Sequence, residues 1–444
     1  MATTPRADRF RAAAVAVLRP AEGLRTHVTV ALAGAVVGLV GGGFRWCLEH
    51  ADRWRVLLLD TAAAHGPAAR WAVPVLLTAV GAALACALAR LAPYAAGSGV
   101  QHVEAVWRQQ GETRALRLLP VKFVGGLIAL GSGLVLGREG PTVHMGAAVG
   151  AIAGRRAGLG PEDARMAHTS LAGAGLAVAF TAPLSGLLFV CEEVTRTVRP
   201  RLVLLALIGT ATAVTCARPL VGDDAVFPIP DPEVPAMWLL PLFVLFGAAT
   251  GALGAAYSAL VVATLAFCDR FTRVPLVARA AVIGAVVGLL MSADRSLAGG
   301  GESLSARLLT GWTPTATVLL LYLAVRFLAG PLSYAAATPG GLFAPLLALG
   351  ALWGVLAHVL LAPLLPAGAG GADAAAFAVL GMGALFAGVV RAPITGIVLI
   401  AEMTGATALL VPLVAASYAA TVTADRLESE PIYDTLRRRM LERP

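Results

Sequence analysis

The stretch that decides the fold is GREGP at residues 137–141, which places Arg138 and Glu139 among glycines and a proline in the middle of apolar sequence. These two are the only acid or strong base between Lys122 and Arg155. A charge at the centre of a membrane helix costs about 2.5–3.5 kcal/mol on insertion scales, so an intramembrane glutamate indicates a functional site. The glycines and the proline predict a broken helix, which is tolerated at membrane depth only where protein buries it or it lines a wet cavity. We therefore expect an ion-binding break here.

The composition of the chain indicates a multispanning membrane protein. Hydrophobic residues make up 58% of the 444 and charged residues 14%, against about 25% charged in a soluble domain, and the mean hydropathy is +0.79. Apolar runs of roughly spanning length predict helices at residues 28–44, 71–91, 118–136, 171–190, 202–216, 237–267, 274–291, 315–328, 377–390 and 408–424. One all-α, polytopic membrane domain accounts for these runs.

The arginines at the two ends of the chain predict its topology. They flank the apolar region as Arg6, Arg9, Arg11, Arg19 and Arg25 on one side and Arg437, Arg438, Arg439 and Arg443 on the other. By the positive-inside rule both termini are cytoplasmic. Residues 1–24 lack the pattern of a secretory signal and fit an interfacial helix or a loose arm better than an organelle transit peptide. The net charge of +8 fits topology and anionic lipid rather than nucleic acid, because the arginines do not interleave with aromatic residues.

An internal repeat organises the chain. APLSGLLFVCEE at residues 182–193 aligns without a gap with APITGIVLIAEM, 210 residues later, and Pro141 lies 204 residues before Pro345 of a second glycine-rich break. Secondary transporters are often built from two repeats whose broken helices meet at the bilayer midplane. The alignment leaves the relative orientation of the repeats open, and we expect them to be inverted. The expected parts are an N-terminal arm at 1–24, repeats at 25–220 and 236–425, a polar linker at 221–235, and a pore-lining helix with a cytoplasmic tail at 426–444.

Four glycine-rich or polar segments predict helix starts that face an anion, at residues 97–99, 137–141, 340–345 and 431–433. A helix N-terminus carries unpaired N–H groups and about half a positive charge, so several aimed at one point would hold an anion without a fixed cation. Ser98 and Tyr433 would add hydroxyl donors suited to a halide. Any one break alone would equally fit a tight loop or close helix packing. Four together favour the anion site.

These residues resemble the CLC family of chloride channels and chloride/proton antiporters. The resemblance runs from about residue 31 to residue 436 and rests on GSG at 97–99, GREGPTV at 137–143, GGLFAP at 340–345 and the late Tyr433, in the family's order and approximate spacing. It implies a bundle with broken, partly re-entrant helices and a homodimer with one anion path per subunit. It also implies a bacterial inner-membrane protein without the C-terminal regulatory domains of many eukaryotic members.

The same resemblance implies the site residues. The family's chloride path would be lined by Ser98, Gly99, Arg138, Glu139, Leu342, Phe343 and Tyr433. Glu139 matches the gating glutamate, whose carboxylate occupies an anion position when ionised and swings out when protonated, and it would accept protons from outside. Glu193 matches the glutamate that passes protons to the cytoplasm in the antiporters, where channels usually have an apolar residue.

The expected function is therefore exchange of chloride for protons, with a passive chloride channel on the same fold as the alternative. An intramembrane enzyme that uses Glu192, Glu193 or His144 as acid or base is a further alternative, but no HExxH, GxSxG or phosphate-binding loop supports it. We expect no cofactor and no metal, because the five cysteines lack CxxC spacing.

Other features are interpreted from the residues or from departures from the family pattern. Lys122, the only lysine, would need a partner if buried, for which Glu104 is the candidate. Gln101 stands where the family often has proline, and Thr181 where it often has asparagine. We expect Glu402, at the repeat-equivalent place of Glu192, to be structural. His144 is interpreted as a packed histidine, with tuning of Glu139 as the alternative.

Overall fold

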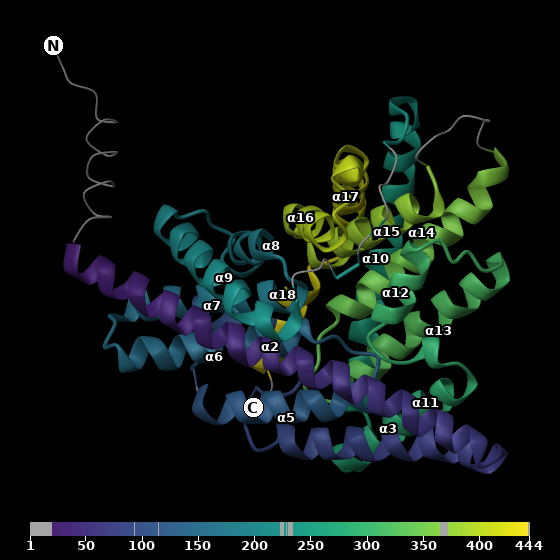
Figure 1. Cartoon of the computed structure of the whole chain (residues 1–444), viewed down its shortest axis with the longest axis horizontal. Coiled ribbons are helices and arrows are strands. Elements are labelled where there is room, and N and C mark those ends of the chain that lie inside the picture. The colour runs from purple at the N-terminus through teal and green to yellow at the C-terminus, as the bar shows by residue number, and fades with distance from the viewer. Residues whose placement is uncertain are drawn as a thin grey trace.

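The computed structural model describes residues 20–92, 94–113, 115–222, 226–227, 229, 234–364 and 372–442. Arg6 to Arg19 of the expected arm, and Asp223, Asp224, Asp231 and Glu233 of the expected linker, lie outside these residues. The described chain is helical throughout, with two isolated backbone bridges in place of a sheet. Its main helices (Figure 1) are α2 (Pro20–Ala64), α3 (Pro67–Ala89), α4 (Val100–Trp107), α5 (Ala115–Gly131), α6 (Glu139–Arg156), α7 (Pro161–Phe180), α8 (Pro183–Phe189), α9 (Pro200–Val221), α10 (Leu240–Asp269), α11 (Leu276–Ala293), α12 (Glu302–Leu309), α13 (Ala316–Tyr334), α14 (Phe343–Leu361), α15 (Ala374–Val390), α16 (Pro393–Thr404), α17 (Leu410–Arg426) and α18 (Ile432–Glu442).

Short turns complete the list: a π-helical turn η1 (Val190–Val194) after α8, and 3₁₀ turns η2 (Met237–Leu239), η3 (Arg295–Leu297), η4 (Ala362–Leu364) and η5 (Thr407–Leu409). All four predicted helix starts are confirmed, as the N-termini of α4, α6, α14 and α18. The site residues described below lie at these four helix starts, except Glu193, which lies in η1.

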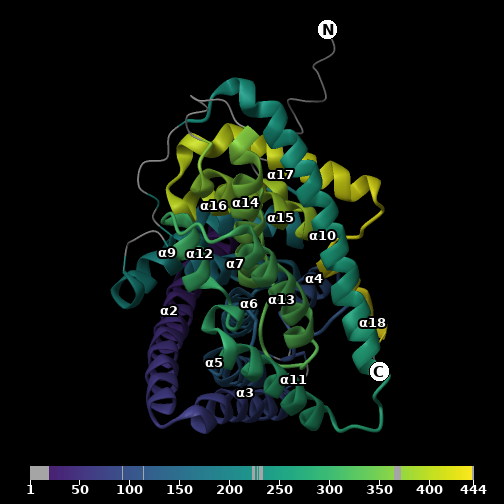
Figure 2. The same ribbon diagram turned by 90° about the vertical axis from the view of Figure 1, so that its right-hand side faces the viewer.

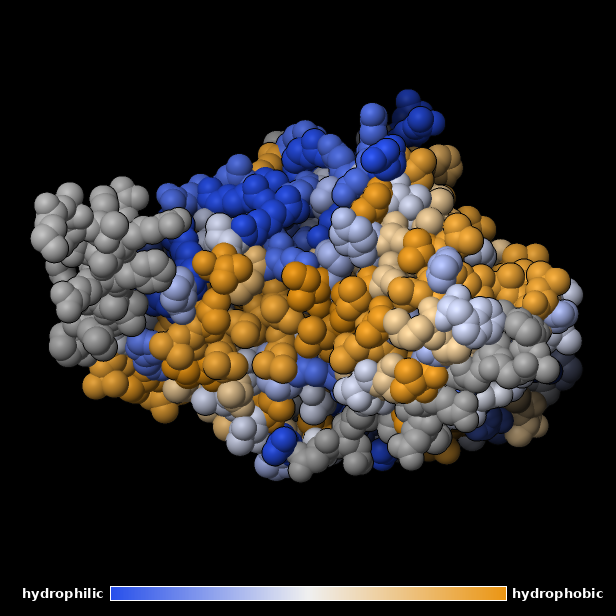
Figure 3. All heavy atoms as spheres, turned by 90° about the horizontal axis from the view of Figure 1, so that it is seen from above, coloured by the Kyte–Doolittle hydropathy of each residue, from blue (hydrophilic) through white to orange (hydrophobic). Residues whose placement is uncertain are grey.

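Eight of the described helices are long and apolar enough to cross a membrane, the longest at Gly23–Ala64. Figure 3 shows apolar side chains in a continuous area across the middle of one face, with hydrophilic residues gathered along one edge. The multispanning prediction is confirmed, but one of the eight, Phe343–Leu364, is absent from the predicted spans. The segment at residues 340–345, where this helix begins, was interpreted as a glycine-rich break, and the helix that follows it was not predicted.

The predicted span at 171–190 is wrong as a single helix. α7 ends at Phe180, and Thr181 caps it in the left-handed conformation with φ 54°. α8 then begins at Pro183, whose ring cannot continue the preceding helix. Arg45 Nη1 donates to Thr181 Oγ1 at 2.9 Å and fixes this turn. Threonine here therefore holds a left-handed position that asparagine adopts more readily, with the hydrogen bond as an added support.

The interior consists of α6, α7, α14 and α15, which the other helices surround (Figure 2). Small residues let these helices approach closely. Where α14 crosses α15, a Cβ on Gly350 would lie 2.4 Å from the Gly381 backbone oxygen, and a Cβ on Gly381 would lie 2.1 Å from the Gly350 oxygen. Helix association in lipid depends on packing of this kind, so the central helices are held at short, fixed separations.

The helices of the two halves correspond in pairs. α4 and α12 are both eight residues long and begin after glycines with φ 94° and 95°, Gly99 and Gly301. α6 corresponds to α14, and α8 to α16. The residues that precede the last pair, Ala182 and Ala392, have nearly the same backbone angles, with φ −127° and ψ 78° against φ −120° and ψ 70°.

The α8 and α16 pair is held together by reciprocal capping. Glu192 accepts hydrogen bonds at the start of α16 from Ile394 N, Thr395 N and Thr395 Oγ1 at 3.0, 2.6 and 2.7 Å. Glu402 accepts the equivalent bonds at the start of α8 from Leu184 N, Ser185 N and Ser185 Oγ at 3.0, 2.8 and 2.5 Å. A carboxylate at a helix N-terminus satisfies unpaired donors and the helix dipole together. The structural role expected for Glu402 is confirmed, and Glu192 has the same capping role.

We predict that Glu402→Ala lowers the free energy of unfolding by about 1–3 kcal/mol, because the donors at the start of α8, two of them part-buried, lose a charged acceptor. The measurement is thermal unfolding in detergent. Glu162→Ala serves as control, since Glu162 is 65% exposed and faces Arg199 at 3.6 Å, where an ion pair contributes little. Equal unfolding midpoints for the two variants would contradict the capping role.

Candidate functional site

The glycine-rich breaks of the two halves pair with each other. Gly137 and Gly341 exchange two backbone hydrogen bonds of 2.8 Å each. Beside them, Gly97 N donates to Thr338 O at 2.9 Å, and Gly340 N donates to Gly97 O at 3.1 Å. These four bonds bring the starts of α4, α6 and α14 together at one point inside the protein.

Glu139 is the first residue of α6, yet its carboxylate caps a different helix. The side chain is fully buried, and Oε1 accepts a hydrogen bond of 2.9 Å from Ala344 N, in the first turn of α14. Oε2 has no partner among the described residues. The first N–H groups of a helix have no acceptor within it. The carboxylate therefore occupies the position at which α14 would hold an anion.

Ser98 and Tyr433 place two hydroxyls beside this carboxylate. Both residues are fully buried, and neither hydroxyl has a hydrogen-bond partner in the described part of the chain. The Tyr433 hydroxyl lies close to the Ser98 hydroxyl and interacts electrostatically with Glu139 and Glu193. A hydroxyl can donate a hydrogen bond to a small anion, so these two buried groups are suitable ligands beside the helix starts.

Glycine at position 140 is what allows this approach. A Cβ on Gly140 would lie 2.6 Å from Ser98 Oγ and 2.8 Å from Ser98 Cα. Both distances are too short for a real side chain. The small residue in the predicted motif thus sets the separation of the three helix starts.

The remaining predicted ligands lie at the same helix starts. Leu342 and Phe343, at the beginning of α14, are fully buried. The Phe343 ring packs at 5.8 Å from the Tyr433 ring. Gly99 is the residue before α4, but its N–H donates to Gln101 Oε1 at 3.2 Å, so this donor is already occupied by the protein.

Lys122 supports the loop that carries Ser98. Its ammonium is fully buried and donates to Ala95 O at 3.0 Å and to Gly97 O at 2.7 Å. The expected pairing with Glu104 is wrong, because Glu104 accepts from Arg108 at 2.8 Å instead. A sequence does not show which backbone carbonyls lie near a side chain. The prediction for Lys122 therefore considered an acidic side chain as its partner.

Arg138 points away from the buried carboxylate. Its guanidinium pairs with Glu302 on α12 at 3.3 Å and lines a cavity of about 490 Å³ that Arg55, Arg295 and Arg307 also line. The acids Glu49, Asp52 and Glu302 also line it, so the lining has one more arginine than acid.

Glu193 lies in the π-helical turn η1 and is 1% exposed, and its two carboxylate oxygens have no hydrogen-bond partner among the residues described. The charges that act on it are those of Glu104, Arg196, Asp434 and Glu192. Turns of this kind often occur at functional sites. A buried acid without a fixed partner is suited to taking up and releasing a proton.

Asp434, on α18 outside the spanning helices, organises the arginines near Glu193. Arg196 donates to it at 2.6 Å and Arg437 at 3.0 Å. Burial opposes ionisation of Asp434, but these two hydrogen bonds hold the pKa of its carboxyl below the usual range. The carboxylate therefore stays ionised at neutral pH and keeps both guanidinium groups in place.

The sequence did not reveal a pair of buried histidines. His102 Nδ1 lies 2.9 Å from His144 Nε2, and His102 Nε2 lies 3.1 Å from the carbonyl of Glu112. Because a carbonyl only accepts, His102 carries its proton on Nε2, and His144 donates from its own Nε2. His144 is thus a packed histidine, as interpreted. Its partner is 42 residues away, too far for a spacing rule to find.

Among the residues described, no group of three or more histidine, cysteine, aspartate or glutamate side chains could hold a metal ion. The site instead consists of helix N-termini, two hydroxyls and buried carboxylates, which defines a membrane protein built to bind a small anion beside ionisable groups.

Comparisons with known proteins agree with this class. Residues 80–425 match the family described as "Voltage gated chloride channel", so the chain belongs to this family. It is 37% identical over 428 residues to the H(+)/Cl(-) exchange transporter ClcA of Vibrio parahaemolyticus, which covers 94% of this chain and 90% of the relative. The ClcA of Yersinia pestis is 35% identical over 429 residues, covering 93% and 87%.

Solved structures agree as well. A slow cyanobacterial Cl⁻/H⁺ antiporter superposes with a TM-score of 0.87 at 30% identity, over 94% of this chain and 98% of that one. A CLC-type fluoride/proton antiporter, at 20% identity, shares the fold with a TM-score of 0.73 over 89% of this chain and 94% of its own.

We predict that Gly140→Ala destabilises the protein by about 1–3 kcal/mol, the usual cost of overpacking, because the added methyl group would displace Ser98. The matched control is Gly43→Ala on α2, where a Cβ would meet nothing within 4 Å. Thermal unfolding in detergent checks both. An unchanged midpoint for Gly140→Ala would contradict the close packing of the three helix starts.

Proposed function

We propose that this protein is a secondary active transporter that exchanges chloride, and similar monovalent anions, for protons across the membrane. The observation that carries the proposal is the hydrogen bond of 2.9 Å that the Glu139 carboxylate accepts from Ala344 N. A carboxylate and a chloride ion compete for the same donors. Occupancy of this position by one or the other therefore links an anion to a protonation state.

The anion ligands follow from the same geometry. Chloride would be held by the hydroxyls of Ser98 and Tyr433, which are buried and available, and by N–H groups at Leu342 and Phe343. N–H groups at Arg138 and Glu139 would face the outer part of the path. Helix dipoles and neutral donors hold a monovalent anion while still allowing its release.

The proton path consists of two carboxylates. When Glu139 is protonated it loses the charge that binds it to α14, so it leaves that position and chloride takes it. Glu193, buried and without a fixed partner, passes protons to the side that holds Asp434 and Arg196. Tyr433 interacts electrostatically with both carboxylates, which supports an anion site between them. A passive chloride channel remains the second candidate, and the buried Glu193 favours exchange over it.

The orientation and assembly complete the proposal. We place both termini in the cytoplasm and the protein in a bacterial inner membrane, surrounded by lipid, as a homodimer with one path per subunit. The matching helices α4 and α12, α6 and α14, and α8 and α16 support two repeats at 25–220 and 236–425, which we propose to be inverted. Light scattering of the purified protein in detergent tests the dimer, and a monomer mass would contradict it.

The direct test of exchange is proton movement into liposomes that contain the purified protein. A chloride gradient drives transport, and potassium with valinomycin sets the voltage. We expect uphill proton movement that follows the chloride gradient. Chloride flux without proton movement would make the protein a channel, and absence of both would overturn the proposed function.

We predict that Glu139→Gln and Glu193→Gln both abolish proton movement and leave chloride flux, because each variant removes a titrating carboxyl and keeps its shape. Glu162→Gln, at an exposed helix start, serves as the control and should transport like the wild type. Proton pumping at the wild-type rate in Glu193→Gln would contradict the role of that residue.

A further inference from the structure

Gln101, the second residue of α4, folds its carboxamide back onto the start of its own helix. Oε1 accepts the Gly99 N–H at 3.2 Å, and Nε2 donates to the Tyr334 hydroxyl at 3.5 Å. The side chain is 7% exposed. The family's usual proline has neither an acceptor nor a donor to place here, so this arrangement is a property of this chain.

The Tyr334 hydroxyl covers the neighbouring backbone donor, the N–H of Ser98. It accepts the Ser98 N–H at 3.4 Å in addition to the bond from Gln101. Two successive backbone N–H groups at the start of α4 are therefore covered by side-chain oxygens. A helix start presents such groups to anions, and the buried, unpartnered Ser98 hydroxyl lies at the same point.

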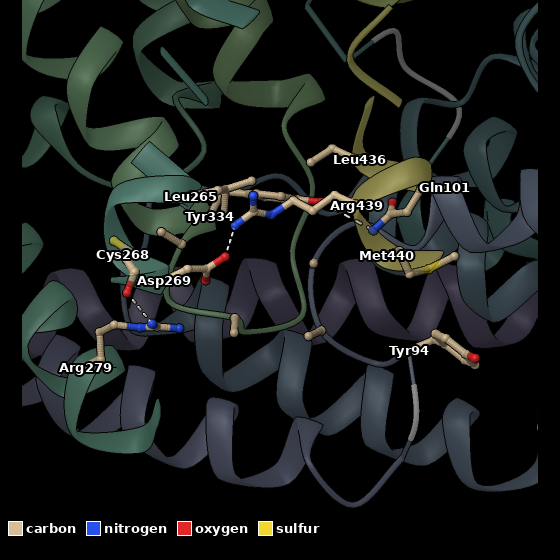
Figure 4. A pocket seen from close by; sticks show the side chains of 14 residues that line it. Tyr94, Gln101, Leu265, Cys268, Asp269, Arg279, Tyr334, Leu436, Arg439 and Met440 are labelled. Atoms are coloured by element: carbon tan, nitrogen blue, oxygen red, sulfur yellow. Dashed lines mark hydrogen bonds and ion pairs between the residues drawn. The ribbon is translucent and has the colours of Figure 1, made fainter. Parts of the chain in front are cut away.

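A cavity on the side of α18 reaches Gln101 and Tyr334, whose side chains cover the Gly99 and Ser98 N–H groups. It has a volume of about 280 Å³, and its lining includes Gly97, Gln101 and Tyr334 together with Arg279 and Arg439. Figure 4 shows Gln101 and Tyr334 joined by a hydrogen bond, with Arg439 beside them and in contact with Asp269. The lining contains two guanidinium groups, of Arg279 and Arg439, and one carboxylate, of Asp269. Its net charge is therefore positive, which favours the approach of an anion.

Gln101 thus caps the start of α4 in the same way as Glu139 caps the start of α14. In each case a side-chain oxygen accepts a backbone N–H at a helix start, at 3.2 Å from Gly99 and at 2.9 Å from Ala344. The two differ in charge. A carboxylate must be protonated before it readily releases the N–H group that it accepts from. A carboxamide is neutral and releases the N–H group without taking up a proton.

We propose that Gln101 sets the anion affinity at the α18 side of the path, by occupying the Gly99 N–H when no anion is present and yielding it to an anion that arrives through this cavity. The proposal rests on the proposed function, because it assumes that the start of α4 binds chloride. A carboxamide carries an acceptor and donors on one rotatable group. A half-turn of its terminal bond therefore presents Nε2 to the incoming ion.

The test is chloride binding to the purified protein in detergent, measured by calorimetry. Gln101→Leu removes the competing oxygen at similar size, so chloride should bind about 2- to 10-fold more tightly, as expected for one neutral hydrogen bond. Gln101→Glu places a negative charge at the same point and should weaken binding at least about tenfold at neutral pH. Its affinity should recover as the carboxyl is protonated in acid.

Gln109→Glu is the matched control. Gln109 is exposed, just past the end of α4, so the same change of charge should leave chloride affinity within about twofold of the wild type. Wild-type affinity in both Gln101 variants would overturn this proposal alone. Absence of chloride binding by the wild type would overturn the proposed function together with it.

A crystal structure of the wild type in bromide tests the proposal without a variant that must fold. We expect anomalous density within hydrogen-bond distance of Gly99 N, with the Gln101 oxygen turned away from it. Bromide elsewhere in the path, with Gln101 Oε1 still on the Gly99 N–H, would overturn the proposal.

Discussion

The proposed exchange depends on one competition, between the Glu139 carboxylate and an anion for the N–H groups at the start of α14. The bond from Ala344 N is 2.9 Å long and lies in an interior without bulk water, where such a charge-assisted bond is strong. The paired breaks, the glycine at position 140 and the lysine under the Ser98 loop all serve to hold that helix start opposite the carboxylate. An anion site without fixed cations thereby gains a partner that responds to protons.

The two halves of the protein are locked together around this point. Gly137 pairs with Gly341 at the centre, and Glu192 and Glu402 each cap a helix of the other half. Each half therefore supplies hydrogen-bond partners for backbone groups of the other half. A break in a membrane helix leaves backbone groups that lipid cannot satisfy, and here the opposite half satisfies them. The neighbouring Glu193 belongs to a π-helical turn that follows one of the capped helices, so its position also depends on this lock.

The sequence predicted the local features of this arrangement well and its pairings poorly. Glycine, proline and isolated charge identified all four helix starts, because those signals are local. Contacts between distant segments carry no such signal. Lys122 therefore bonds to two carbonyls rather than to Glu104, and the partner of His144 was missed. The apolar run at 171–190 hid a turn because Thr181 is an uncommon residue at a left-handed position.

The most direct test of the account is the number of protons taken up when chloride binds. Calorimetry in buffers of different ionisation enthalpy measures this number for the purified protein. Competition predicts that chloride binding to the wild type near neutral pH takes up protons, because the displaced Glu139 carboxylate is protonated as it leaves α14. The same measurement on Glu139→Gln should give no uptake. Chloride that binds the wild type without proton uptake would contradict the central claim, since the anion and the carboxylate would then not share one position.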